Sequence, residues 1–430
     1  MRRSAAREGR RPTRNPDSAN MTASSPSTGA QPVRGTFDTG EGGSLRLRLE
    51  GAGHNAGAYF RSQSFTLQPN NESILAAGLL PCMQAGRSLA VEGAVSRRML
   101  DSLPTFMEIF HGWHPHLKPV EILGARPVER SRKPGARVGI LFSGGVDTFY
   151  SLLMHQQHIT DLIFVRGFDM ELDEHATHER ALAMVHETAA HLGKGVVEVE
   201  TDLRPYLTGL GLRWGMHSHG PFLASIGHLL YPEFGTLYIA TSMYYARIVP
   251  WSSHPLLDPL WGTEGLEFIH DGLEARRPDK VRMLAEHDWV LQALRVCSRN
   301  PQTKLNCGRC EKCIRTMLSL EAAGALERCP TFETPLDPGR VRRLEMKRAG
   351  TLNYAQMNLD ALRAAGGKEP LIRALQSAMK RSRRKMRARE FMQRRLPDIL
   401  AFIRRLRRGS PASSNPAADN SHLSARDRIT

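Results

Sequence analysis

Apolar positions repeat with two different periods along the chain, and the change between them divides the sequence. From 44 to 50 apolar and polar residues alternate strictly, which predicts a β-strand with one buried face. Segments 59–67 and 89–95 predict further strands, and the spacing of apolar residues in 97–113 predicts a helix. We therefore expect residues 36–130 to form a small, β-rich α+β domain, whose role the sequence does not indicate.

From residue 138 onward, short apolar runs alternate with amphipathic segments. The predicted strands are 138–142, 161–166, 196–199 and 236–240, and the helices between them are 147–157, 178–192 and 222–231. Strands separated by helices of this length are typical of a parallel sheet with helices on both faces. The sequence therefore predicts an α/β fold for a domain at 131–335.

Charge changes the picture at the two ends of the chain. The net charge is +16, of which 1–35 carry +5 and 368–408 carry +12, so the body between them is nearly neutral. Residues 1–35 are poor in apolar residues, and we interpret them as a disordered basic extension or, alternatively, an organelle transit peptide. Met21 is an alternative start, and 409–430 predict a disordered tail.

Residues 336–408 predict a helical, basic C-terminal segment, with a helix over 368–408 interrupted at Pro397. An arm that contacts RNA, a helix on a membrane surface, a docking helix for an acidic partner and a solvated helix remain open. No apolar run is long enough to span a membrane. Six cysteines are too few for a disulfide scaffold, so we expect a reducing, cytoplasmic location.

A glycine-rich loop follows the strand at 138–142 and opens the next helix. It reads Ser143, Gly144, Gly145, Val146, Asp147, Thr148. The glycines let the backbone approach an anion, the helix start offers free N–H groups, and the two hydroxyls add hydrogen-bond donors. The spacing is that of neither a Walker A loop nor a Rossmann loop. The loop predicts a phosphate site, with Asp147 orienting donors or holding Mg²⁺.

This S-G-G-x-D-[ST] loop resembles the PP-loop of the N-type ATP pyrophosphatases, an adenine nucleotide alpha hydrolase-like fold. The resemblance implies that ATP is cleaved to AMP and pyrophosphate. It also implies that Ser143 and Asp147 act in catalysis and that the whole loop binds the ATP phosphates. Thr148 stands where serine is commoner and keeps the hydroxyl.

Four cysteines follow the spacing C-x9-C-x2-C-x2-C, at Cys297, Cys307, Cys310 and Cys313. Four thiolates without histidine suit a structural, tetrahedral Zn²⁺ site. An iron–sulfur cluster is the alternative. Cys82 and Cys329 stand apart, and we expect them to be buried as apolar residues.

The loop and the four cysteines together resemble the 7-cyano-7-deazaguanine synthase family over residues 137–325. That family is zinc-dependent and adenylates a carboxylate for attack by ammonia. Where it tends to show Asp-Tyr-Gly-Gln, this chain has Val165, Arg166, Gly167, Phe168 and Asp169. The resemblance therefore implies a paralogous adenylating or amidating enzyme with an additional N-terminal domain.

Other residues are weaker candidates. Gly167 and Phe168 follow a predicted strand, where α/β sheets bind ligands, and are expected to contact the nucleotide, with Asp169 near the ribose or Mg²⁺. Thr241 and Ser242 end a later strand in the same sense. His217, Ser218, His219 and Gly220 lie in a connection that could close over the site, either with a general acid or base role or as a plain loop. Glu264, Glu267, His270 and Asp271 could meet the substrate or Mg²⁺, or form a solvated helix start. Arg276, Arg277 and Lys280 could hold the α-phosphate or an acidic substrate, or be exposed helix charges. Asn306 is expected to cap a turn. We expect His111, His114 and His116 to be surface histidines, with metal binding as the alternative.

Three functions follow as hypotheses. The first is an AMP-forming carbon–nitrogen ligase or amidase that uses ATP, Mg²⁺ and a structural Zn²⁺ on a small-molecule carboxylate, with nitrogen from ammonia or a partner glutaminase. The second is a tRNA-modifying enzyme of the thiolation type that uses 368–408 as an RNA arm. The third is a non-catalytic nucleotide-sensing subunit. The sequence does not indicate the oligomeric state.

Overall fold

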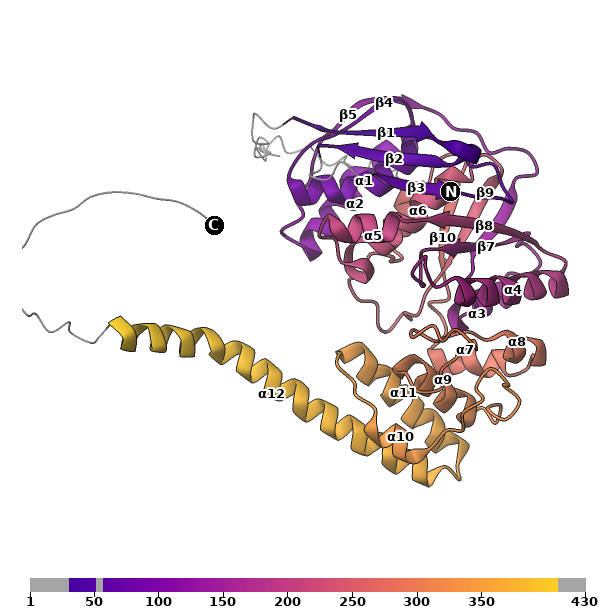
Figure 1. Ribbon diagram of the computed structural model, residues 1–430, viewed down its shortest axis with the longest axis vertical. Helices are drawn as coiled ribbons and strands as arrows, with labels where there is room; N and C mark the ends of the chain where they lie inside the picture. The colour runs from indigo at the N-terminus through magenta and orange to yellow at the C-terminus, as the bar shows by residue number, and fades with distance from the viewer. Residues whose placement is uncertain (1–30, 52–56, 409–430) are drawn as a thin grey trace, which may run out of the picture. The chain divides into compact units, whose positions relative to one another are not determined.

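A computed structural model describes residues 31–51 and 57–408, with side chains up to residue 392. The chain divides into two compact units, Met1–Asn306 and Cys307–Thr430, which are described separately. The first holds the sheet and the second is helical (Figure 1).

The first unit is built on one sheet, with ten strands in the described part of the chain. The strand order is β10-β9-β6-β7-β8-β3-β2-β1-β4-β5. The strands are β1 Val33–Thr39, β2 Leu45–Glu50, β3 Ala58–Arg61, β4 Leu89–Ser96, β5 Ile122–Val128, β6 Arg137–Leu141, β7 Asp161–Arg166, β8 Gly195–Thr201, β9 Phe234–Ala240 and β10 Glu267–Asp271. Most neighbours pair in parallel, and helices flank the sheet, so the predicted α/β class is confirmed.

The helices of this unit follow the strands in alternation from β6 onward. They are α1 Asn71–Ala85, α2 Arg97–Trp113, α3 Val146–Met154, α4 His175–Leu192, α5 Leu203–Gly209, α6 His219–Leu229, α7 Arg277–Leu284 and α8 Asp288–Ala293. Short helical turns are η1 Glu41–Gly43, η2 Trp214–Ser218 and η3 Asp258–Trp261.

The parallel strands β6 to β10 have an order that matters for ligand binding. Strand β6 lies between β7 and β9 and is parallel to both. The chain runs outward from β6 to β8 on one side and from β9 to β10 on the other, which is the order of Rossmann-like sheets. Successive connections therefore diverge at the carboxyl end of β6, where such sheets bind ligands.

The strands of the predicted N-terminal domain continue this same sheet. Phe60 and Arg61 of β3 pair antiparallel with Thr201 and Glu200 of β8. The Tyr59 backbone N–H also donates to Asp202 at 2.7 Å, and its hydroxyl donates to Glu200 at 2.8 Å. The residues that we expected to form a separate domain at 36–130 are therefore part of the same sheet. Strand β3 pairs with β8 and so covers an edge of the parallel strands that would otherwise be exposed.

The expected disordered ends are tested only in part. Strand β1 begins at Val33, inside the segment 1–35 that we expected to be disordered, and the Val33 side chain is fully buried. Its apolar side chain joins the core, which accounts for the difference. Residues 1–30 and the tail 409–430 lie outside the described residues.

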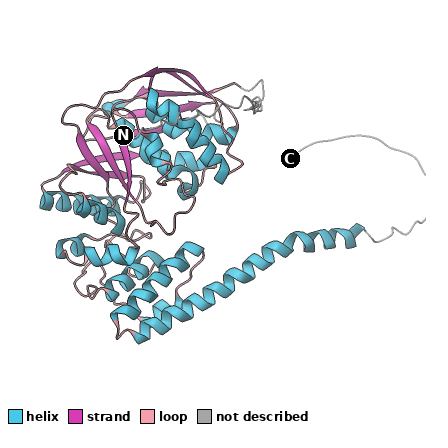
Figure 2. Ribbon diagram, turned by 180° about the vertical axis from the view of Figure 1, so that it is seen from behind, coloured by secondary structure: helices cyan, strands magenta, loops and turns pink. Residues whose placement is uncertain are grey.

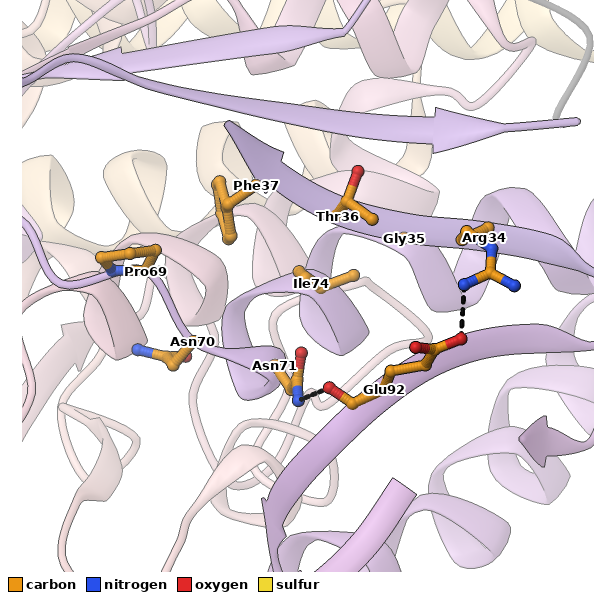
Figure 3. A pocket seen from close by; sticks show the side chains of 9 residues that line it. All are labelled: Arg34, Gly35, Thr36, Phe37, Pro69, Asn70, Asn71, Ile74 and Glu92. Atoms are coloured by element: carbon orange, nitrogen blue, oxygen red, sulfur yellow. Dashed lines mark hydrogen bonds and ion pairs between the residues drawn. The ribbon is translucent and has the colours of Figure 1, made fainter. Parts of the chain in front are cut away.

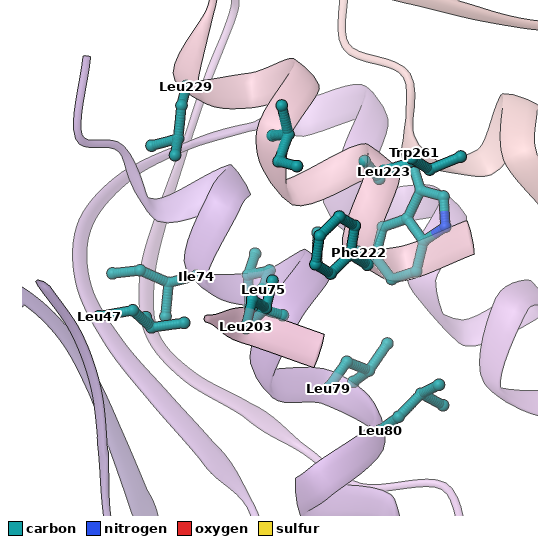
Figure 4. Close-up of a cluster of buried hydrophobic side chains, with 14 of the residues drawn as sticks. Leu47, Ile74, Leu75, Leu79, Leu80, Leu203, Phe222, Leu223, Leu229 and Trp261 are labelled. Carbon is teal, nitrogen blue, oxygen red and sulfur yellow. The ribbon is translucent and has the colours of Figure 1, made fainter. Parts of the chain in front are cut away.

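Helix α1 was not predicted because it is apolar on all sides. Leu75 and Leu79 are fully buried, as are most of its other residues, so no polar face marks its period. Figure 4 shows α1 side chains in one cluster with Phe222 of α6 and Trp261 of η3. This cluster extends to β-strand side chains such as Leu47, so it joins the N-terminal strands to the rest of the sheet.

The second unit is a helical bundle with its own core. Its helices are α9 Glu311–Ala322, α10 Pro338–Arg343, α11 Ala349–Ala365 and α12 Glu369–Arg408. Ile314, Leu359 and Leu375 belong to the core that α9, α11 and the first part of α12 share. Figure 2 shows the helices of this unit, with α12 the longest.

Helix α12 runs through Pro397, so the predicted interruption there is wrong. A proline removes one backbone hydrogen bond and crowds the preceding turn, but the helical turns on either side of it can persist. Among the residues that the structure describes, no helix combines the length and the apolar composition needed to cross a bilayer.

Buried neutral histidines predict a loss of stability in acid. Burial lowers the pKa of His228 to about 4, and its ring lies 3.0 Å from the Trp261 carbonyl. Its pKa in the unfolded chain is about 6.5, so below this pH the unfolded state binds more protons than the folded state.

We therefore expect the free energy of unfolding to fall between about pH 6.5 and 4.5, by up to about 1.4 kcal/mol per pH unit for each such histidine. Urea titrations across this range measure it. His228→Gln should flatten the slope relative to His158→Gln, an exposed control. An equal slope in both variants would contradict the assignment.

Candidate functional site

The glycine-rich loop lies at the carboxyl end of β6 and leads into α3. Gly144 has a φ of +73°, and a Cβ there would lie 2.3 Å from the Met184 side chain. The positive φ favours glycine at this position, and a larger residue would also have to displace the Met184 methyl group. Gly145 precedes the first residue of α3 and makes no side-chain capping bond, so the helix start presents backbone N–H groups at the diverging edge of the sheet.

Asp147 in the first turn of α3 is paired with two buried cations. Its carboxylate accepts from Arg277 Nη1 at 2.9 Å and from Lys280 Nζ at 3.3 Å. Lys280 Nζ also donates to the Thr241 carbonyl at 2.5 Å and lies 5.2 Å from the ring centre of Tyr150. These contacts join α3, α7 and the end of β9 next to the loop.

The expectation that these cations are exposed helix charges is wrong for two of the three. Arg277 is 7% exposed and Lys280 is 1% exposed. Arg276 is exposed and pairs with Asp279 at 2.9 Å. The sequence alone could not distinguish the two buried cations from the exposed Arg276, because their burial depends on how α7 packs against α3.

A third cation, Arg295, was missed by the sequence analysis. Its side chain is buried, and its backbone N–H donates to the Gly144 carbonyl at 2.8 Å. Its guanidinium donates to Asn300 at 3.0 Å and lies 3.5 Å from the Ser143 carbonyl. Burial lowers the pKa of Arg295, with Asp169 and Glu174 opposing that shift.

The loop thus lies among three buried cations, of which Arg277 and Lys280 share one carboxylate. A helix start and an excess of positive charge together favour a polyanion such as a phosphate chain. The Thr148 hydroxyl donates to the Gly145 carbonyl at 3.1 Å, so its oxygen can still accept a hydrogen bond.

Gly167 and Phe168 lie at the carboxyl end of β7, the strand beside β6. Gly167 has a φ of +86°, and a Cβ there would lie 2.0 Å from the Thr201 carbonyl oxygen, so glycine is needed for close packing. Phe168 packs against Trp214, with ring centres 4.9 Å apart, and against Phe222 at 5.3 Å. Their contact with a nucleotide stays a prediction.

The acidic candidates of 264–271 do not begin a helix. Glu267–Asp271 form β10, and His270 Nδ1 lies 2.7 Å from a carboxylate oxygen of buried Asp258, which accepts the hydrogen bond. Asp271 pairs with His155 at 2.8 Å. Glu264 accepts from the backbone N–H groups of Arg98 and Arg130. Glu264, His270 and Asp271 therefore have structural partners, whereas Glu267 is exposed. The segment was misread because β10 lacks strict alternation.

Thr241 and Ser242 follow β9 at the same edge of the sheet as the loop. The Thr241 hydroxyl accepts from the Met243 backbone N–H at 3.1 Å. The Thr241 backbone N–H donates to the Asp271 carbonyl at 2.9 Å, so the ends of β9 and β10 are held together.

The segment that we expected to close over the site belongs to the interior. His217 and Ser218 are buried in η2, and Gly220 lies in the first turn of α6. The His217 ring lies 4.7 Å from His114 and 5.4 Å from His116, and burial lowers its pKa to about 4.

The predicted surface histidines also differ in part. His114 is buried, His116 is exposed, and His111 lies between, with a ring nitrogen 2.9 Å from the Leu117 carbonyl. The His114 ring lies 5.3 Å from that of Phe110 and 4.7 Å from that of His217, and the second of these contacts joins segments about 100 residues apart, which the sequence pattern does not show.

The four clustered cysteines come together as predicted. The sulfur atoms of Cys297, Cys307, Cys310 and Cys313 all lie within 4.8 Å of one another. Cys307 and Cys313 have sulfurs 3.9 Å apart. Backbone N–H groups of Arg309 and Cys310 point at the Cys307 sulfur at 3.4 and 3.3 Å, as expected of a thiolate acceptor.

This geometry fits one tetrahedral ion. A Zn–S bond of about 2.3 Å places sulfurs about 3.8 Å apart around a tetrahedron. Gly308 has a φ of +62°, which permits the tight turn between two of the ligands. The four cysteines could therefore hold a metal ion such as zinc.

Residues near the cysteines have structural roles. Buried Asn306 accepts from the Val296 backbone N–H at 2.8 Å and donates to the Leu294 carbonyl at 2.7 Å. These two bonds tie Asn306 to the chain segment before Cys297. Cys82 and Cys329 are buried, as predicted.

A pocket on another part of the first unit does not coincide with these groups. Figure 3 shows it between β1 and the start of α1, lined by side chains that include Arg34, Phe37 and Ile74. Arg34 pairs there with Glu92. Nothing in its lining concentrates charge or metal ligands.

The chain was compared with known protein families, curated proteins and solved structures. No family model, no curated protein and no solved structure matches the chain.

Because Asp147 pairs with buried cations, we expect the effects of mutating Asp147 and Lys280 on the free energy of unfolding to be non-additive. Asp147→Asn leaves Lys280 and Arg277 buried without their carboxylate and should cost about 3 kcal/mol of unfolding free energy. Adding Lys280→Met removes one stranded charge and should recover a measurable part of that loss. Urea denaturation measures both, with Asp279→Asn as the control, because Asp279 is 29% exposed and pairs with the exposed Arg276 and Arg282; this change is expected to cost under about 1 kcal/mol. Additive losses in the double variant would contradict this pairing.

The cysteine cluster predicts one bound metal ion per chain. Elemental analysis of purified protein should find about one zinc, and Cys310→Ser should lose it and lower the thermal midpoint. Cys329→Ala, a change to a buried cysteine outside the cluster, should keep the metal. Iron in place of zinc, with visible absorption, would contradict the single-zinc assignment.

Proposed function

We propose that this chain is an ATP-dependent enzyme that forms AMP and pyrophosphate, and that it activates a small-molecule carboxylate for attack by a nitrogen nucleophile. It would belong with the PP-loop ATP pyrophosphatases and resemble the 7-cyano-7-deazaguanine synthase family. The observation that carries the proposal is the Ser143–Thr148 loop, which opens α3 at the diverging edge of the sheet, beside buried cations.

The groups around the loop have the charges that this reaction needs. Adenylation transfers AMP to the substrate carboxylate and releases pyrophosphate, so negative charge collects on the leaving group. Loop N–H groups and the Ser143 hydroxyl would hold those phosphates. Arg277 and Lys280 are close enough to the loop helix to pair with Asp147, and they would turn to the phosphate oxygens when these arrive.

Asp147 would then be available for Mg²⁺, because the incoming phosphates replace it as the partner of the two cations. Mg²⁺ when bound supplies charge neutralisation on the phosphates. Val146, Gly144 and Gly145 contribute backbone rather than side chains. Gly167 and Phe168 would border the nucleotide from the end of β7.

A nitrogen nucleophile fits better than a sulfur carrier. A sulfur-transfer route needs a reactive thiol, and the described cysteines outside the metal cluster are Cys82 and Cys329. Burial raises the pKa of the Cys82 thiol to about 12 and raises that of Cys329. Neither is suited to act as a thiolate. The nitrogen would come from ammonia or a partner glutaminase, and the zinc would be structural.

One observation favours a second candidate, a tRNA-modifying enzyme of the same superfamily. Helix α12 carries many exposed basic side chains, which suit an RNA substrate. A non-catalytic nucleotide sensor is the third candidate, and the same assay separates all three.

The test measures AMP and pyrophosphate released from ATP by the purified chain. One series receives the small-molecule fraction of a cell extract and another receives total tRNA. We expect release driven by small molecules. Release driven only by tRNA would favour the second candidate, and ATP binding without turnover in both series would favour the sensor.

Ser143→Ala is the diagnostic variant, because it removes a hydroxyl at the loop without stranding a buried charge. We expect release to fall about 10²-fold or more. Thr208→Ala is the matched control, since the Thr208 hydroxyl bonds only within its own helix at 2.8 Å. Equal activity of the two variants, or ADP as the product, would contradict the proposal.

A further inference from the structure

A basic stripe follows one face of α12. Arg373, Lys380, Arg384 and Arg387 have the spacing i, i+7, i+11 and i+14, which places them in one row along the helix. All four are exposed. With a rise of about 1.5 Å per residue the stripe is about 21 Å long.

The opposite face of the same helix is the one that packs into the second unit. Leu375, Met379 and Ser382 are buried, and the Ser382 hydroxyl accepts from the Met346 backbone N–H at 3.2 Å. Packing therefore fixes the rotation of α12 and directs the stripe away from its own core.

The stripe residues have no acidic partner in the described part of the chain, whereas two neighbouring cations on α12 bond to the segment of α10 and the residues after it. Lys385 pairs with Glu345 at 2.5 Å. Arg381 donates to the Arg342 carbonyl at 2.6 Å and to the Leu344 carbonyl at 3.1 Å. Lys385 and Arg381 thus hold α12 against α10 and the residues that follow it. The charges of the four stripe residues remain available to a partner outside the chain.

An aromatic side chain continues the row. Phe391 follows Arg387 by four residues, on the same face, and is 59% exposed. Arginine outnumbers lysine in the stripe, and guanidinium groups both pair with phosphates and stack on bases. A row of cations ending in an exposed aromatic ring suits a single strand whose bases are unpaired.

We propose that Arg373, Lys380, Arg384 and Arg387 bind the phosphate backbone of RNA, with Phe391 stacking on an unpaired base. The partner is RNA with single-stranded regions rather than a bilayer, because the described stripe has one aromatic and no apolar face to insert. This interaction does not require the loop at Ser143 or ATP.

The test is fluorescence anisotropy of a labelled single-stranded RNA of 20 nucleotides, titrated with the full chain at several salt concentrations. Replacing all four stripe residues with glutamine should weaken binding at least about tenfold and reduce the slope of log affinity against log salt by about 3. Phe391→Ala should weaken binding a few-fold and leave the salt slope unchanged.

A matched control removes the same charge elsewhere. It replaces one lysine and three arginines, all exposed, with glutamine: Arg46, Arg97, Lys118 and Arg126. An equal loss in this control would overturn the stripe as the site. Tighter binding of duplex DNA or of vesicles containing phosphatidylserine than of the RNA would overturn RNA as the partner.

Discussion

The pairing of one carboxylate with two buried cations is the constraint on which the candidate site depends. A lysine as buried as Lys280 is costly unless a charge and hydrogen bonds compensate it. Asp147 and the Thr241 carbonyl supply both, and in doing so they hold α3, α7 and the end of β9 together. The glycine loop begins α3, so the same ion pairs that stabilise this edge also fix where the loop's N–H groups lie.

The sheet makes this edge possible. Because β6 lies between β7 and β9, the connections diverge at its carboxyl end, where α3 starts. The N-terminal strands contribute from the other end, since β3 pairs with β8 and closes its free edge. Their cores are continuous through α1 and α6, so the added strands enlarge the sheet that carries the loop.

The sequence predicted those elements whose patterns have a local cause. Alternation in 44–50 marked β2, and the loop residues marked the turn into α3, because glycine permits the positive φ that Gly144 adopts there. Helix α1 has no polar face, and β10 is too short to alternate clearly, so both were missed. Cys307, Cys310 and Cys313 were predicted to cluster because C-x2-C turns bring thiolates together through local backbone geometry, and Cys297 joins them from ten residues earlier in the chain.

The partners of Asp147 could not be predicted in the same way. Arg277 and Lys280 lie about 130 residues along the chain from it, and nothing in their own neighbourhood distinguishes them from exposed helix charges such as Arg276. Arg295 was missed for the same reason, since only tertiary packing brings it to the loop. Long-range charge pairs of this kind become visible when the fold is known.

The central claim is that the loop after β6 binds the pyrophosphate portion of ATP. Isothermal titration with inorganic pyrophosphate and Mg²⁺ tests it without knowledge of the substrate. The account predicts saturable binding to the full chain, competition with ATP, and a marked loss of affinity in Ser143→Ala but not in Thr208→Ala. Absence of pyrophosphate binding, or equal affinity in the two variants, would contradict it.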